Sequence, residues 1–121
     1  MVTKAELYIN VLQELEKSTT DILSTAIVTQ DGLIMSCTPS NCVDRETFAA
    51  YSAATFKHAG SAMDEISKEN IDMLLAESKD YRLIIMRATD YALLTALTGR
   101  NAQIGMVLFE MQKTIQKIKG L

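Results

Sequence analysis

The sequence predicts an α+β domain in which helices cover both faces of an antiparallel sheet. Two apolar segments, 81–88 and 91–98, are joined by only two residues, a spacing typical of a tight hairpin. Both segments are apolar on both faces in their middle, whereas a sheet with one wet face would alternate apolar and polar residues. We therefore expect helices above and below these strands.

The first predicted element is a helix. Thr3 and Glu6 form a Thr-x-x-Glu capping box, which satisfies two free backbone amides reciprocally. Apolar residues then recur at helical spacing; they are Leu7, Tyr8, Val11, Leu12 and Leu15. The polar run at 18–20 ends this helix.

A β-hairpin is predicted next. Residues 22–30 are rich in Ile, Val and Thr, and residues 33–37 form a second apolar run. Asp31-Gly32 between them indicates a type I′ turn, which needs positive φ at both central residues. Pro39 cannot donate to a strand ladder, so we expect it to end the second strand.

The longest predicted helix, 45–66, is capped by Asp44 and carries two apolar faces. The wide face, which we expect to lie on the sheet, consists of Phe48, Tyr51, Thr55, Ala59, Ala62, Met63 and Ile66. The small-residue stripe beside it consists of Ala49, Ala53, Phe56 and Gly60. Because glycine inside a helix costs about 1 kcal/mol relative to alanine, Gly60 indicates the close approach of another backbone. We interpret the stripe as a seam for the same helix of a second subunit; the alternative is an alanine-rich helix with one tolerated glycine.

Three strands, 71–78, 81–88 and 91–98, and a final helix with apolar residues at helical spacing from Ile104 to Ile118 complete the predicted order. Five antiparallel strands leave two edges, and an exposed edge invites pairing with another chain. The first of the three strands is apolar with few charges, so it is a candidate for pairing with its two-fold mate. The predicted dimer interface is then Ala49, Ala53, Phe56, Gly60, Ile71, Met73 and Leu75.

Composition narrows the class of protein. We take residues 1–121 as a single domain, long enough to bury a core without staples. Twelve Lys and Arg against fifteen Asp and Glu give a net charge of -3, which argues against nucleic acid and against a basic membrane anchor. Residues 1–10 lack the apolar region of a signal peptide, and no apolar run is long enough to insert into a membrane, so we expect a cytoplasmic protein.

The residues that could carry chemistry are few. His58 is the single histidine, and no catalytic motif accompanies it, so we predict neither an enzyme, nor a cofactor, nor a metal site. Cys37 and Cys42 flank a short loop and are expected to be reduced, with a disulfide closing that loop as the alternative. Arg82, Arg87 and Arg100 are either anchors for a partner or solvated strand ends.

The chain resembles the roadblock family in its stand-alone prokaryotic form, from about residue 7 to residue 118. Residues 26–34, AIVTQDGLI, are similar to the first hairpin of that family, and residues 48–54, FAAYSAA, resemble its alanine-rich second helix. Residues 90–97, DYALLTAL, followed by 101–105, NAQIG, resemble its last strand and the start of its last helix. The ordered set of these segments carries the resemblance more than any one of them.

The resemblance implies a five-stranded antiparallel sheet in the order 2-1-5-4-3, with the long helix on one face and the two terminal helices on the other. It implies dimerisation through the second helix and third strand, and binding of a Ras-like small GTPase by a protein that is not itself an enzyme. We therefore expect a homodimeric adaptor or regulator that biases the nucleotide state or location of such a GTPase. The alternative is a small-ligand sensor domain of profilin-like outline, which would need a pocket with a few convergent polar groups.

Overall fold

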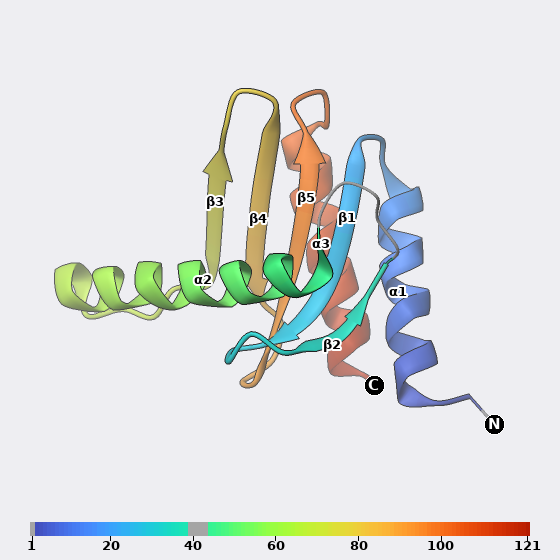
Figure 1. Ribbon diagram of the computed structural model, residues 1–121, viewed down its shortest axis with the longest axis horizontal. Coiled ribbons are helices and arrows are strands. Elements are labelled where there is room, and N and C mark those ends of the chain that lie inside the picture. Colours follow the sequence, from blue (N-terminus) through green and yellow to red (C-terminus); the bar gives the residue numbers. More distant parts are fainter. Residues whose placement is uncertain (1, 39–43) are drawn as a thin grey trace.

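The computed structural model describes residues 2–38 and 44–121, which fold into three layers (Figure 1). Within these residues the elements are α1 (Lys4–Ser18), β1 (Ile22–Thr29), β2 (Ile34–Cys37), α2 (Arg45–Ser67), β3 (Met73–Glu77), β4 (Tyr81–Arg87), β5 (Ala92–Gly99) and α3 (Ile104–Lys119). The antiparallel strands lie in the order β2-β1-β5-β4-β3. Helix α2 crosses one face, and α1 and α3 cover the other. The predicted α+β class, element order and sheet order are confirmed.

Polar side chains set the ends of the first two helices. The Glu6 amide donates to Thr3 Oγ1 at 3.2 Å at the start of α1, and the Thr47 amide donates to Asp44 Oδ2 at 3.0 Å at the start of α2. Helix α2 ends where Lys68 adopts a left-handed φ of 63°. Both predicted N-caps are therefore confirmed, but among the described residues no bond from the Thr3 amide to the Glu6 side chain completes the predicted capping box.

The hairpin β1–β2 forms as predicted, but its turn differs. The Gly32 amide donates to the Thr29 carbonyl at 3.0 Å, and the Thr29 amide donates to the Leu33 carbonyl at 2.8 Å. Gly32 has a φ of 95°, whereas Asp31 does not have positive φ. The loop is thus a three-residue connection with glycine in the left-handed position after an ordinary turn, and the type I′ prediction is wrong. The predictions for Pro39 and Cys42 lie outside the described residues.

Side chains of the central strands point alternately into two apolar cores, one on each face of the sheet. Ile84 and Leu94 face α1 and α3, whereas Ile85 and Leu93 face α2. All four are fully buried, with exposed fractions of 0%. This confirms that the doubly apolar segments 81–88 and 91–98 lie between helical layers. No helix within the described ranges is both long and apolar enough to cross a membrane.

The assignment of the two faces of α2 is corrected by the structure. Ala49, Ala53 and Phe56, predicted to form an exposed seam, are 0–4% exposed and pack on the sheet within their own chain. Ser52 lies among them, with its hydroxyl 3.0 Å from Thr95 Oγ1. Small side chains let the helix approach the sheet closely, so the smooth stripe rather than the wide face is the core-facing one. A Cβ on Gly60 would lie 3.0 Å from Ile71 Cγ2, so the close neighbour of Gly60 is a side chain of the same chain.

Phe56 provides a direct test of this correction. We expect Phe56→Ala to lower the free energy of unfolding by about 3–5 kcal/mol, because it empties a buried site. Phe109, on α3, is 57% exposed, so Phe109→Ala should change the same quantity by less than about 0.5 kcal/mol. Urea titrations of both variants measure the difference. Similar losses in the two variants would contradict the packing of α2 described above.

Two glutamates on α1 have pKa values shifted in opposite directions. Burial raises the pKa of Glu16 above its ordinary 4.5, although Thr38 Oγ1 donates to Glu16 Oε1 at 2.8 Å. A hydrogen bond from Lys117 Nζ, 2.6 Å from Glu14 Oε2, lowers the pKa of Glu14. The folded state therefore binds a proton more tightly at Glu16 and less tightly at Glu14 than the unfolded state does.

These shifts predict opposite pH dependences for two matched variants. The contribution of Glu16 to stability falls as the pH rises above about 4.5, whereas that of Glu14 is lost as the pH falls below about 4.5. The free energy of unfolding of Glu16→Gln, minus that of the wild type, should therefore rise between pH 3 and pH 7. The same difference for Glu14→Gln should fall. Urea titrations across this range test both, and two slopes of the same sign would refute the assignment.

Candidate interaction surface

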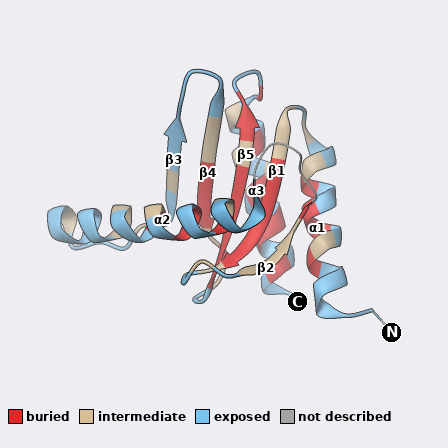
Figure 2. Ribbon diagram, in the orientation of Figure 1, coloured by how far each residue is buried: buried red, intermediate tan, exposed pale blue. Residues whose placement is uncertain are grey.

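The C-terminal half of α2 extends past the edge of the sheet. Figure 1 shows the helix crossing the strands and continuing beyond β3, and Figure 2 shows that this half is largely exposed. Ile66 is 80% exposed and Met63 41%, and Tyr51 in the first half is 69% exposed. The wide face of α2 is therefore an apolar surface that its own chain leaves largely uncovered.

Strand β3 forms the edge of the sheet next to this overhang. It pairs with β4 and has no second neighbour among the described strands. Met73 and Leu75 are 42% and 38% exposed. Ile71, also predicted at this edge, precedes the strand, and its half-buried side chain packs against the core beneath α2. The strand is thus an open, apolar edge, as the sequence predicted.

Helix α2 leaves one end of its sheet face bare. Near the β3–β4 turn, a shallow hollow of about 200 Å³ is lined in part by Ala76, Tyr81, Leu83 and Leu97. Leu83 also packs at the border of the core beneath α2, and its register partners Ala76 and Leu97 share that face. The overhanging helix and this bare region are both apolar, and both lie at the β3 side of the sheet.

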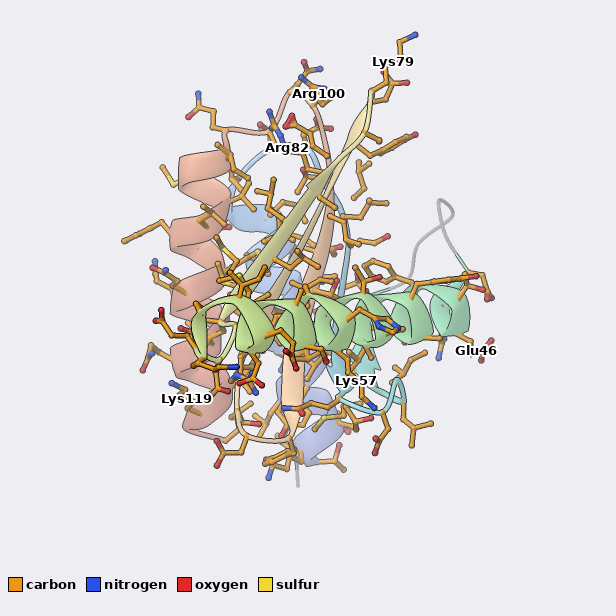
Figure 3. The ribbon with its side chains drawn as sticks, turned by 90° about the vertical axis from the view of Figure 1, so that its left-hand side faces the viewer. Glu46, Lys57, Lys79, Arg82, Arg100 and Lys119 are labelled. Atoms are coloured by element: carbon orange, nitrogen blue, oxygen red, sulfur yellow. The ribbon has the colours of Figure 1, made fainter. Side chains whose placement is uncertain are left out.

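Two of the three singled-out arginines stabilise the far end of the sheet. Arg82 Nη1 donates to the Ala102 carbonyl at 2.9 Å, and Arg100 Nη1 donates to the Ser78 carbonyl at 3.0 Å. Both guanidinium groups also lie within 3.7 Å of the Glu77 carboxylate. Figure 3 shows Lys79 at the same end. These arginines bind their own backbone and are neither free anchors nor simply solvated.

The third arginine lines a pocket beneath α2. Arg87 Nη2 donates to the Ile71 carbonyl at 3.0 Å, and its guanidinium lies 5.5 Å from the centre of the Phe56 ring. The pocket has a volume of about 310 Å³, with a floor from Ala53, Phe56 and Leu93. Its polar lining comes from Gln30, Asp31, Lys57, Ser61, Asn70 and Arg87. The sequence singled out Arg87 but did not predict the pocket, because its lining residues come from five separate segments.

No group that suggests catalysis or metal binding stands out. Within residues 2–38 and 44–121, no three His, Cys, Asp or Glu residues are close enough to hold a metal ion. His58 lies on an exposed position of α2. Cys37 is half-buried on β2.

A family model for the Roadblock/LC7 domain matches residues 8–98 of the chain. The chain belongs to the Roadblock/LC7 domain family. Among curated proteins, none matches the chain in sequence. The matched region of this roadblock domain contains α2 and the β3 edge, and it ends just before α3.

Solved structures of the same fold agree with this assignment. A Roadblock/LC7 domain from Streptomyces avermitilis is 18% identical, with a TM-score of 0.86 over 91% of this chain and 92% of that one. MglB from Myxococcus xanthus is 14% identical, with a TM-score of 0.87 over 96% and 94%. An MglB solved in a tetrameric arrangement is also 14% identical, with a TM-score of 0.86 over 98% and 90%. At these identities the likeness establishes the roadblock fold.

Proposed function

We propose that this roadblock protein is a homodimeric, non-enzymatic adaptor or regulator that binds a Ras-like small GTPase. The observation that supports the dimer is the pairing of an uncovered apolar helix face with an open apolar strand edge. Membership of the roadblock family supports the GTPase, because members of that family bind Ras-like GTPases. A binding role also agrees with the three arginines described above, which donate hydrogen bonds to backbone carbonyls of their own chain.

The geometry of the edge favours a two-fold dimer. If β3 pairs antiparallel with its copy, the two sheets become one continuous sheet, and no apolar edge remains at the join. The rotation then places the overhanging half of each α2 above the bare region of the partner's sheet. Met63 and Ile66 would cover the partner's Leu83 and Leu97, and the wide faces of the two α2 helices would meet. A single two-fold rotation would therefore bury both the wide face of α2 and the open edge of β3.

A dimer of this kind can regulate a GTPase by selective binding. A partner that binds one nucleotide state better than the other shifts the population toward that state, in proportion to the difference in affinity. A tenfold preference corresponds to about 1.4 kcal/mol. Such an effect requires no catalytic group in the roadblock protein itself.

The wide face gives the test of the dimer. Ile66→Glu places a charge on the overhang and should shift the mass in solution from twice the 13.4 kDa chain mass toward 13.4 kDa. Ala54 is exposed on the solvent side of the same helix, so Ala54→Glu carries the same added charge and should leave the dimer intact. Light scattering on a sizing column measures both. A wild-type monomer, or an Ile66→Glu variant that stays dimeric, would refute the proposed interface.

The GTPase proposal is tested with small GTPases of the same organism. Each is loaded with GDP or with a GTP analogue, and the wild-type roadblock protein should retain at least one of them in one state on a sizing column. If neither nucleotide state of any candidate binds, the adaptor role is refuted. Ile66→Glu in parallel shows whether dimerisation is required.

One observation favours the alternative function, a small-ligand sensor. Such a domain needs a pocket with an apolar floor and convergent polar groups, and the pocket beneath α2 has both. Ligand binding in that pocket would depend neither on the GTPase nor on the dimer.

A further inference from the structure

Arg87 is a half-buried cation without an acidic partner. Among the described residues, no carboxylate lies within 4.0 Å of its guanidinium. Of its five N–H donors, one hydrogen bond is accounted for, from Nη2 to the Ile71 carbonyl. Arginine that is withdrawn from water is ordinarily paired. The remaining donors of Arg87 therefore favour an anion in the pocket that this side chain lines.

The lining limits the charge of that anion. Lys57 and Arg87 are cationic and Asp31 is anionic, so the titratable side chains of the pocket carry a formal charge of +1. A ligand with one negative charge neutralises the +1 charge of this lining. A phosphate dianion would instead leave a net negative charge in a pocket that already contains the Asp31 carboxylate. The planar guanidinium also matches a carboxylate with two parallel hydrogen bonds.

The apolar base and the volume of the pocket limit the polarity and size of the rest of the ligand. Ala53 and Phe56, each 4% exposed, present a small apolar surface at the base of the pocket, and Leu93 is fully buried beneath it. The volume of about 310 Å³ is at the lower end of the range for small-molecule sites. We propose that the pocket beneath α2 binds a small monocarboxylate, with its carboxylate on Arg87 and its flat apolar part against the exposed edge of Phe56.

The pocket and the wide face lie on opposite flanks of α2. Lys57 and Ser61 line the pocket, whereas Thr55 and Ile66 belong to the wide face, and at 100° per residue the two pairs are more than a third of a turn apart. Figure 3 shows Lys57 projecting below the helix, away from the end of the sheet that carries Lys79. Ligand binding is therefore compatible with either a monomer or a dimer.

The probe for the test is benzoate, a flat monocarboxylate, titrated into the wild-type protein and followed by two-dimensional NMR. We expect saturable shifts confined to the amides of residues around the pocket, such as Gln30, Gly60 and Ile71. Benzamide has the same shape without the charge, so it should bind at least about tenfold more weakly. Inorganic phosphate should also bind more weakly. Absence of saturable shifts with benzoate, or equal binding of all three probes, would overturn the proposal.

Matched charge reversals locate the site without disturbing the core. Lys57→Glu changes the lining from +1 to -1, and it should weaken benzoate at least about tenfold, because Lys57 is an exposed rim cation of the pocket. Lys79→Glu makes the same change in net charge at the far end of the sheet, and it should leave benzoate affinity within about twofold, since distant exposed charges are screened. Arg87→Gln should abolish binding, with the fold checked by the unchanged NMR shifts of α3. Equal effects of the two lysine variants would place the anion elsewhere and refute the site.

Discussion

The close packing of Ala49, Ala53 and Phe56 on the sheet determines which surfaces of this protein are available. These side chains are small or flat, and they bring α2 near enough for the Ser52 hydroxyl to reach Thr95 at 3.0 Å. Once this stripe faces the core, the wide face with Tyr51 and Ile66 must point outward. The uncovered apolar surface is thus a direct consequence of how the helix is seated.

The packing beneath α2 also accounts for the open edge. Strand β3 contributes no fully buried side chain, and half-buried Leu74 is its one member that packs against the core beneath α2. The ladder to β4 holds this strand in place, and arginines add contacts at both ends, since Arg82 and Arg100 lie near Glu77, its last residue, and Arg87 donates to the Ile71 carbonyl before its start. Hydrogen bonds and ion pairs of this kind position a strand without covering its apolar side chains. An edge held in this way is ordered and still available for pairing.

Local signals predicted the elements of the fold, whereas contacts between distant segments did not follow from them. The caps at Thr3 and Asp44 and the doubly apolar strands around Ile84 and Leu94 depend on neighbours in sequence and on simple covering rules. The two faces of α2 could not be ranked by apolar area, because alanine contributes little area but permits the closest approach to a sheet. The Asp31-Gly32 turn failed for a similar reason, since a three-residue loop with Gly32 in the left-handed position fits the same dipeptide. The pocket could not be predicted from the sequence, because Arg87, Lys57 and Gln30 are far apart along the chain and are brought together only by the folded sheet.

Helix α2 connects the two surfaces that carry the proposals. Its wide face would meet the second subunit in the proposed dimer, and its opposite flank borders the pocket with Lys57 and Arg87. Ile71 links them physically, because its side chain packs beside Gly60 while its carbonyl accepts from Arg87, two residues before β3 begins. The Ile71 carbonyl accepts from Nη2, and the other donors of Arg87 are the ones that the proposed carboxylate would use. The pocket and the edge strand therefore meet at one residue, Ile71, while the proposed ligand and the proposed second subunit use different flanks of α2.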